Sequence, residues 1–346
     1  MKRILIEMEK LKNPNSGLGQ FCQNLGEEFQ QINPQHLELD FYLPALQKNV
    51  FGEHFNYVKH FAIHKLFPVS SKIYDVWHCL QQDSNYLPTN KNTKLILTIH
   101  DLNFLEKYKG SKQKRELAAL QKRVKKADVI TVISKFTELI VRENLELYNK
   151  PVHVIYNGNS LKTIENAIRP DYITFSNFIF SIGIISEKKN FHTLLPLLRN
   201  NKQLHLVIAG NSNSSYAQQL ISASKKMGVD AQLHLPGIID DASKYWLYKN
   251  CSAFVFPSLS EGFGLPVVEA MSMGKPVFLS YLSSLPEVGG AEAYYWKTFE
   301  PQSMIDVFDK GMNDFTSEKS KRSVEWAQQF SWKNAAKAYL KLYEEI

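Results

Sequence analysis

The sequence predicts an α/β protein of two domains, each a parallel β-sheet wound with helices. The chain has 346 residues, more than one hydrophobic core usually supports at roughly 100–200 residues per domain. Short apolar runs alternate with segments of helical periodicity, which is typical of parallel sheets. This alternation stops over a weakly patterned stretch at 159–177 and then starts again, which predicts a domain break near residue 165.

Eleven apolar runs are expected to be strands. In chain order they are RILIEM (3–8), LELDFYL (37–43), DVWHCL (75–80), KLILTIH (94–100), DVITVIS (128–134), VHVIYNG (152–158), FIFSIG (178–183), LHLVIAG (204–210), QLHLPG (232–237), AFVFPS (253–258) and PVFLS (276–280). Several intervening segments have helical periodicity, as at 113–126. Ligands bind beyond the carboxyl ends of strands in open α/β sheets, so these ends are where chemistry is expected.

The composition is that of a soluble globular protein, with 44% hydrophobic and 22% charged residues. The N-terminal apolar run is too short for a signal peptide, and no run approaches the roughly 18 apolar residues of a membrane span. The three cysteines (Cys22, Cys79 and Cys251) are scattered and lack metal-ligand spacing. They are expected to be reduced, buried thiols of a cytoplasmic protein.

The net charge of +7 lies almost wholly in the first half. Residues 1–165 carry 23 Lys/Arg against 17 Asp/Glu, whereas residues 166–346 carry 18 against 17. Nine bases and one acid, Glu116, fall within 107–126. This run is either a solvated helix face or a surface for an anionic lipid or acceptor. No nucleic-acid partner is expected, because no DNA- or RNA-binding signature accompanies the charge.

The stretch PSLSEGFGLPVVEAMSMGKPV (257–277) reads as the end of a strand, a turn and a helix. Pro266 suits the first helical position and Gly274 suits the end of the helix. Glu269 is expected within the first helical turn, near the positive end of the helix. The backbone N–H groups of the preceding turn suit a phosphate or a polyhydroxyl ligand.

The same stretch places Glu261 and Glu269 eight positions apart, on either side of a Gly-Phe-Gly turn. Each carboxylate could accept a pair of hydroxyl donors, as recognition of a sugar and a ribose requires. The alternative for each glutamate alone is structural. Glu269 would then complement the helix dipole, and Glu261 would be a solvated loop residue.

This stretch resembles the E-x7-E motif of retaining glycosyltransferases of the GT-B fold, family 4 (group 1). The resemblance extends over most of the chain, in the family's order. The similar segments are SGLGQFCQNL (16–25), LILTIHDLNFL (95–105), ADVITVISKFTELIV (127–141), VHVIYNG (152–158), FIFSIGIISEKKNFHTLL (178–195), LHLVIAGN (204–211), LPGIIDD (235–241), SSLPEVGG (283–290) and FSWKNAAKAYLKLYEEI (330–346).

The resemblance implies two Rossmann-like domains whose parallel sheets face each other across a cleft. Residues 1–165 would bind the acceptor and residues 166–328 the nucleotide-sugar. Residues 329–346 would form a helix that returns to the N-terminal domain.

In the family the first glutamate of the motif lies beside the transferred sugar, and the resemblance gives this role to Glu261. The second glutamate holds the ribose, and the resemblance gives this role to Glu269. The N–H groups that follow the first glutamate would contact sugar and phosphate; they belong to Gly262, Phe263, Gly264 and Leu265. A helix N-terminus also stabilises a diphosphate leaving group as its charge develops.

The family neutralises the diphosphate with an arginine and a lysine beyond the first strand of the C-terminal domain. Lys189 stands at the lysine position, and Ile184 replaces the arginine expected after the glycine. Lys188 is the expected substitute, although lysine lacks the bidentate fork of arginine. A solvated pair of lysines at a helix start is the alternative.

Four further residues receive roles from the resemblance. Gly17 and Gly19 would let the first loop approach the diphosphate or acceptor, unless they form a plain turn. His100 would lie near the transferred sugar, unless it is a structural histidine. Gly237 would contribute backbone groups to nucleobase binding.

No metal or cofactor is expected. The chain has no Asp-x-Asp pair, no His/Cys cluster and no phosphate-binding loop ending in Lys-Ser/Thr. Protein cations and dipoles would therefore take the place of Mg²⁺. A front-face route to retention, with the leaving phosphate as base, would need no protein nucleophile.

These observations favour a hexosyltransferase, mannosyl- or glucosyltransferase-like, that acts on a glycan or lipid-linked acceptor in cell-surface polysaccharide or lipopolysaccharide synthesis. The alternatives are a non-catalytic nucleotide- or carbohydrate-binding protein on this fold and a nucleotide-sugar epimerase. Residues 41–67 hold seven Phe/Tyr and three His. With 107–126, they would attach the protein peripherally to the anionic inner face of the cell membrane, unless they form an ordinary core.

Overall fold

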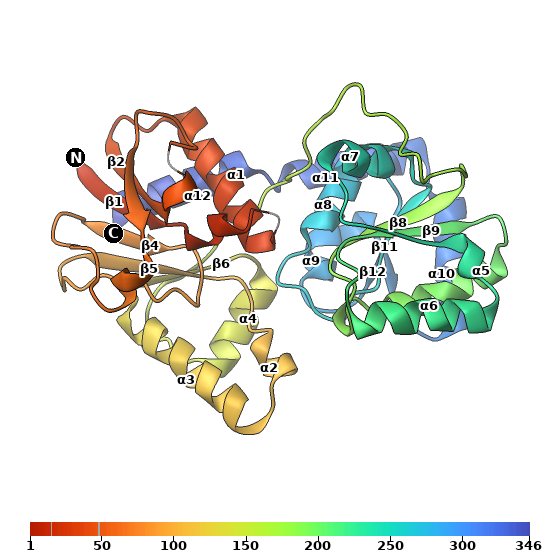
Figure 1. Ribbon diagram of the computed structural model, residues 1–346, viewed down its shortest axis with the longest axis horizontal. Helices are drawn as coiled ribbons and strands as arrows, with labels where there is room; N and C mark the ends of the chain where they lie inside the picture. Colours follow the sequence, from red (N-terminus) through yellow and green to blue (C-terminus); the bar gives the residue numbers. More distant parts are fainter. Residues whose placement is uncertain (15, 48) are drawn as a thin grey trace. The chain divides into compact units, whose positions relative to one another are not determined.

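The computed structural model describes residues 1–14, 16–47 and 49–346 and divides the chain into two compact units (Figure 1). Unit 1 consists of Met1–Gly158 and Ser331–Ile346, and unit 2 is Asn159–Phe330. The chain thus leaves unit 1 after Gly158 and returns to it for its last helix. Each unit is a parallel sheet covered by helices on both faces.

In the described part of unit 1 the sheet has seven parallel strands in the order β3-β2-β1-β4-β5-β6-β7. They are β1 (Lys2–Glu7), β2 (Leu37–Pro44), β3 (Asn56–His60), β4 (Val76–Cys79), β5 (Lys94–Ile99), β6 (Val129–Val132) and β7 (Val152–Val154). The six runs predicted in this half are all strands. The edge strand β3 was not predicted, because its sequence NYVKH is only partly buried and lacks an apolar run.

The helices of unit 1 are α1 (Gly17–Ile32), α2 (Phe104–Lys107), α3 (Gly110–Lys126), α4 (Lys135–Asn144) and α12 (Trp332–Glu345). Helices α1 and α12 cover one face of the sheet, and α3 and α4 cover the other (Figure 1). Serine side chains begin three of these helices by accepting a backbone N–H, as preferred N-caps do; they are Ser16, Ser134 and Ser331.

A buried polar network ties α12 to the sheet of unit 1. His78 of β4 is hydrogen-bonded through Nδ1 to the Tyr343 hydroxyl at 2.7 Å and through Nε2 to the Thr98 hydroxyl at 2.7 Å. Burial lowers the pKa of His78 to about 3. At the same C-terminal end of the helix, Lys2 Nζ donates to the carbonyl of Glu344 at 2.7 Å. The last helix is therefore an integral part of unit 1.

In the described part of unit 2 the sheet has six parallel strands in the order β10-β9-β8-β11-β12-β13. They are β8 (Phe178–Ile182), β9 (His205–Ala209), β10 (Leu233–Gly237), β11 (Ala253–Phe256), β12 (Val277–Ser280) and β13 (Tyr294–Trp296). The five predicted runs are strands, and the three-residue edge strand β13 was not predicted. Its short YYW segment is too brief to show a period.

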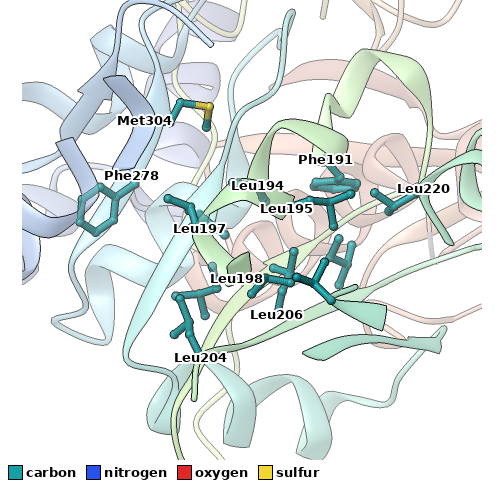
Figure 2. Packing of buried hydrophobic residues seen from close by; sticks show 14 of the residues in the cluster. Phe191, Leu194, Leu195, Leu197, Leu198, Leu204, Leu206, Leu220, Phe278 and Met304 are labelled. Carbon is teal, nitrogen blue, oxygen red and sulfur yellow. The ribbon is translucent and has the colours of Figure 1, made fainter. Parts of the chain in front are cut away.

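The helices of unit 2 are α5 (Leu195–Asn200), α6 (Ser215–Met227), α7 (Asp241–Asn250), α8 (Leu265–Ser272), α9 (Leu285–Gly289), α10 (Pro301–Asp314) and α11 (Ser317–Gln328). Side chains of α5, α6 and α10 pack against β8, β9 and β11 in one buried cluster, which includes Phe191, Leu194, Leu198, Leu206, Leu220 and Met304 (Figure 2). This core fixes the strands whose carboxyl ends carry the polar residues of interest.

Among the described residues, no helix is long and apolar enough to cross a membrane. The described part of the chain also lacks any group of three or more His, Cys, Asp or Glu side chains that could hold a metal ion. All three cysteines are buried free thiols, and burial raises the pKa of Cys251 to about 12.

Candidate active site

The strand order of unit 2 reverses between β8 and β11, because β9 follows β8 on one side and β11 lies on the other. In open α/β sheets the crevice at the carboxyl ends of such strands binds ligands. The loop after β8 carries Lys188 and Lys189, and the loop after β11 carries Ser258 and Glu261. The fold thus brings together polar residues about 70 positions apart in the sequence.

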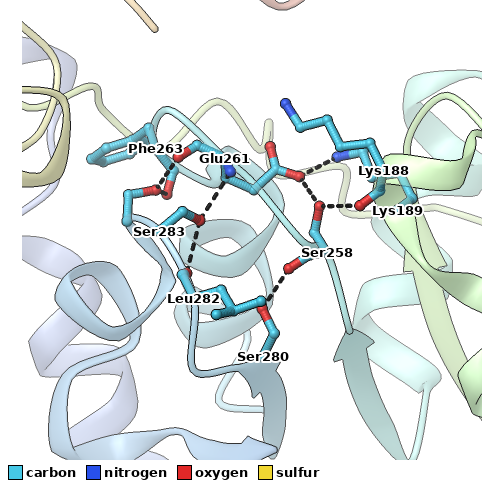
Figure 3. A network of polar contacts seen from close by, with 9 residues as sticks. Lys188, Lys189, Ser258, Glu261, Phe263, Ser280, Leu282 and Ser283 are labelled. Atoms are coloured by element: carbon cyan, nitrogen blue, oxygen red, sulfur yellow. Dashed lines mark hydrogen bonds and ion pairs between the residues drawn. The ribbon is translucent and has the colours of Figure 1, made fainter. Parts of the chain in front are cut away.

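Glu261 lies at the centre of a hydrogen-bonded network (Figure 3). Its Oε1 lies 2.7 Å from Lys189 Nζ and accepts a bond from the Ser258 hydroxyl. Its backbone N–H donates to Ser283 Oγ at 2.9 Å. Burial on its own would raise the pKa of Glu261, but the charges of Lys189 and Lys188 lower it below its ordinary value. The carboxylate is therefore ionised and firmly held at neutral pH.

Lys189 is placed by the turn after β8. Gly183 has φ +143°, and a Cβ at this position would lie 3.1 Å from Lys189 Cε, so the glycine leaves room for the lysine stem. Lys189 Nζ lies 4.3 Å from the centre of the Phe256 ring, a cation–π distance. Ile184, at the position where the family has arginine, is 68% exposed. The positive charge at this site therefore comes from lysine.

The backbone of Lys188 also joins the two loops. Its carbonyl accepts a bond from the Leu259 N–H at 2.8 Å, and Ser258 Oγ lies 3.3 Å from the same carbonyl oxygen. These contacts fix the spacing between the lysine loop and the glutamate loop. Lys188 and Lys189, both proposed for the diphosphate from the sequence, thus lie beside Glu261.

The turn before α8 requires glycine. Gly264 has φ +108°, a conformation that costs little only for a residue without Cβ. The Phe263 carbonyl accepts a bond from the Ser284 hydroxyl at 2.7 Å, and the Phe263 ring packs on Phe330 with ring centres 5.5 Å apart. The Phe263 side chain is therefore a packing element, and only its backbone is suited to a ligand. Gly262 precedes it in this turn and Leu265 begins the helix.

Glu269 does not lie in the first turn of its helix, and that prediction was wrong. Helix α8 begins at Leu265, one residue before Pro266, so Glu269 is its fifth residue. Its carboxylate faces α7, where Oε1 accepts from Lys244 Nζ at 2.6 Å and Oε2 accepts from the Tyr248 hydroxyl at 2.8 Å. Glu269 is 3% exposed. A pair of direct side-chain contacts, not the helix end, holds this carboxylate.

Gly237 ends β10 with φ +82°, and its carbonyl accepts a bond from the Gly210 N–H at 2.7 Å. Gly237 thus belongs to the same carboxyl edge of the sheet as the glutamates, three strands away from β11.

In unit 1, His100 follows β5 and is 6% exposed. Its Nε2 donates to the Leu80 carbonyl at 2.7 Å, so Nε2 carries a hydrogen and the lone pair of the neutral ring is on Nδ1. Burial lowers the pKa of His100, although the Leu80 carbonyl and Asp101 oppose this. The ring meets Phe21 of α1 edge to face at 4.7 Å. His100 is therefore a fixed, neutral imidazole at physiological pH.

The two glycines of the first loop differ. Gly17 is the first residue of α1, and nothing lies within 4 Å of where its Cβ would be. At Gly19 a Cβ would lie 2.0 Å from the Asn13 carbonyl oxygen. A side chain at position 19 would therefore clash with the backbone of Asn13, whereas the space beside Gly17 is open to an approaching group.

Reasoning from the sequence missed several residues that contact the two glutamates, among them Lys244, Tyr248, Ser258 and Ser283. The spacing of Lys244 and Tyr248 places them on one face of a helix, but nothing in the sequence shows which element that face meets. The two serines belong to small-residue loops whose partners are far away in the chain.

Two family models match this chain. Residues 170–330 match the family described as "Glycosyl transferases group 1", and residues 50–162 match "Glycosyltransferase Family 4". The chain belongs to the family 4 glycosyltransferases of group 1.

The similar curated proteins of this family include mannosyltransferases of Escherichia coli. The serotype-specific mannosyltransferase WbdA is 29% identical over 264 residues, which cover 70% of this chain and 32% of WbdA. The chain therefore matches about a third of the length of WbdA. The O-antigen chain mannosyltransferase B is 22% identical over 391 residues, which cover 99% of both proteins.

Solved structures of glycosyltransferases share the fold. The structure of Anabaena HepE in complex with UDP and glucose has a TM-score of 0.76 at 17% identity, and the match covers 100% of both chains. Sucrose-phosphate synthase from Thermosynechococcus elongatus has a TM-score of 0.75 at 16% identity, with 100% of this chain and 99% of that protein covered. The two α/β units with parallel sheets are thus those of the GT-B fold.

Proposed function

We propose that this protein transfers a hexose from a nucleoside-diphosphate sugar to a glycan or lipid-linked acceptor in the synthesis of a cell-surface polysaccharide or lipopolysaccharide. The main observation behind the proposal is the ion pair between Lys189 and Glu261, at the point where the strand order of the unit 2 sheet reverses. The buried Glu269 is the second. The related mannosyltransferases and the UDP-containing HepE structure support a nucleotide-sugar donor of the mannosyl or glucosyl type.

The residues of the unit 2 site bind different parts of the nucleotide-sugar donor. Glu269 accepts bonds from the ribose hydroxyls, and Glu261 accepts from a hydroxyl of the transferred sugar. Lys188 and Lys189 neutralise the diphosphate, assisted by the N-terminus of α8. Their charges stabilise the leaving group most when the glycosidic bond breaks, which is when such groups accelerate a reaction. Gly237 offers backbone groups to the nucleobase.

The reaction proceeds with retention of anomeric configuration and without a metal ion. The leaving phosphate takes the proton of the acceptor hydroxyl on the same face of the sugar, so no side chain has to attack the anomeric carbon. The lysines supply the positive charge that Mg²⁺ provides in other transferases. Glu261 is ionised and hydrogen-bonded through Oε1, and this favours binding of hydroxyls over covalent attack.

Unit 1 serves the acceptor. His100 presents Nδ1 as a hydrogen-bond acceptor for a substrate hydroxyl, because Nε2 is committed to the Leu80 carbonyl. Gly17 offers an open approach at the start of α1. These features support a polar, hydroxyl-rich substrate on this edge of the unit 1 sheet.

The protein works in the cytoplasm, attached peripherally to the anionic inner face of the membrane. Of the nine bases within 107–126, eight are exposed. The stretch 41–67, in which residue 48 lies outside the described residues, splits in two. Phe41, Tyr42, Phe51 and Phe55 are buried, whereas Phe61, Ile63, Leu66 and Phe67 are exposed. Apart from Leu46, which is also exposed, the exposed apolar side chains of this stretch lie in the second part, where lysines flank them.

Vesicle flotation tests the attachment. Wild type should float with vesicles that contain anionic lipid and not with neutral ones. The double variant Leu66→Ser/Phe67→Ser should lose most of this binding. Ile168→Ser, which removes another exposed apolar side chain (80%) from unit 2, should keep it. Equal failure of wild type with both kinds of vesicle would reject the attachment.

The transferase activity is tested with UDP-, GDP- and ADP-linked glucose and mannose. One donor should raise the thermal unfolding midpoint and support transfer, with equal rates in EDTA and with the product in the donor's anomeric configuration. Loss of transfer in EDTA would reject metal independence, and an inverted product would reject retention. Absence of both binding and transfer with all six donors would reject a hexosyltransferase of this class.

A further inference from the structure

Two side chains of α7 hold the carboxylate of Glu269 from one side. Lys244 Nζ lies 2.6 Å from Oε1, and the Tyr248 hydroxyl lies 2.8 Å from Oε2. Lys244 and Tyr248 are four residues apart in the helix and therefore project from the same face. Each carboxylate oxygen thus has its own hydrogen-bond donor, and the two hydrogen bonds together fix the orientation of the carboxylate plane.

The two donors differ in burial. Tyr248 is fully buried, and its ring meets Phe180 edge to face at 5.0 Å. Its hydroxyl also lies 3.3 Å from the Pro266 carbonyl. The Lys244 side chain is 20% exposed, against 4% for that of Glu269. Tyr248 is therefore a rigid support, and Lys244 closes the solvent side of the carboxylate.

The carboxylate of Glu269 keeps hydrogen-bond acceptor positions that a diol could use. A carboxylate offers about four lone-pair positions, two on each oxygen. Tyr248 and Lys244 occupy one on each oxygen of Glu269, so one on each oxygen remains. Two neighbouring acceptor positions match the two hydroxyls of a ribose.

We propose that Lys244 is a positioning residue of the donor site: it fixes Glu269 so that both carboxylate oxygens face the ribose diol of the nucleotide. This inference rests on the proposed function, since it requires a nucleotide donor. Lys244 does not itself bind the nucleotide. Its removal would let the Glu269 carboxylate rotate about the bond to Tyr248 and would weaken recognition of the ribose.

The test compares ribonucleotides with their 2′-deoxy forms. Binding of UDP, GDP and ADP and of the matching 2′-deoxy nucleotides is measured by calorimetry on the full chain, as wild type, Lys244→Met, Lys244→Arg and Lys249→Met. Lys249 lies on the same helix and is exposed over the Tyr245 ring at 5.8 Å, which makes it the matched control.

Wild type should prefer the ribonucleotide about tenfold, as expected for one charge-assisted hydrogen bond. In Lys244→Met this preference should fall to about twofold, and ribonucleotide binding should weaken about fivefold to tenfold. Lys244→Arg should restore most of the preference, and Lys249→Met should match wild type. The donor KM of Lys244→Met should rise while kcat stays within about twofold.

Three results would overturn the inference. An unchanged ribose preference in Lys244→Met would show that Lys244 does not orient Glu269. Tighter ribonucleotide binding by this variant would show that the lysine competes with the ribose. An equal effect of Lys249→Met would indicate a general effect of charge. If wild type binds none of the nucleotides, the proposed function fails as well; if wild type binds and Lys244→Met keeps its preference, only this inference fails.

Discussion

The Lys189–Glu261 pair allows the stability and the function of the site to be separated. Lys189→Met removes the cation 2.7 Å from Glu261 Oε1. Removing one partner of a fully buried pair costs about 3–5 kcal/mol, and exposed pairs contribute less than ~1 kcal/mol. With side chains that are 15% and 14% exposed, and with Ser258 still bonded to Glu261, we expect a loss of about 2–3 kcal/mol.

The assay is urea unfolding of the full chain, with Lys202→Met as the control that removes an exposed lysine from unit 2. The loss in Lys189→Met should shrink towards pH 5, because a protonated Glu261 no longer needs a cation. The double variant Lys189→Met/Glu261→Gln should recover most of the stability, since it removes both charges, yet neither variant should transfer sugar. A Lys189→Met variant as stable as Lys202→Met, or a double variant no more stable than the single one, would refute this account of the pair.

Two further predictions concern buried groups. His78 has a pKa of about 3 in the folded protein, so the unfolded chain binds more protons below its ordinary pKa of about 6.5. Its contribution to stability is complete above pH 6.5 and should be lost by up to about 1.4 kcal/mol per pH unit on acidification. The measurement is the urea unfolding midpoint of wild type and His78→Gln as a function of pH. Equal pH dependence of the two midpoints would contradict this. Glu269→Gln should weaken nucleotide binding by about 1.5–3 kcal/mol through loss of the charge-assisted bonds to ribose, measured by calorimetry. Unchanged affinity would remove Glu269 from the ribose site.

The sequence was sufficient to predict the framework of both units. Buried parallel strands are continuous apolar runs, and each such run predicted here is a strand. The strands that were missed, β3 and β13, are short edge strands with partly exposed residues, so they lack that signal. The aromatic stretch at 41–67 was ambiguous because an apolar core and an apolar surface use the same residues. Only packing distinguishes them.

The candidate site was predictable where the motif lies in one segment. Glu261 was identified from the pattern of its own segment and Lys189 from the family resemblance, and the fold brings Lys189 Nζ within 2.7 Å of Glu261 Oε1. The position of Glu269 in its helix was predicted one residue too early, because proline is accepted at either of the first two helical positions and the helix begins at Leu265. Lys244 and Tyr248 could not be connected to Glu269 from the sequence, since α7 meets α8 through tertiary packing alone.

The most direct test of the central claim is the rate of sugar transfer by Glu261→Gln compared with wild type, together with nucleotide affinity on the same samples. Glutamine keeps the size of the side chain but removes the charge that Lys189 and Ser258 hold in place. We predict a fall in kcat of about 10²–10³, a size typical for the loss of one preorganised electrostatic group, with the nucleoside-diphosphate Kd within about threefold. Transfer at the wild-type rate by Glu261→Gln would contradict the account.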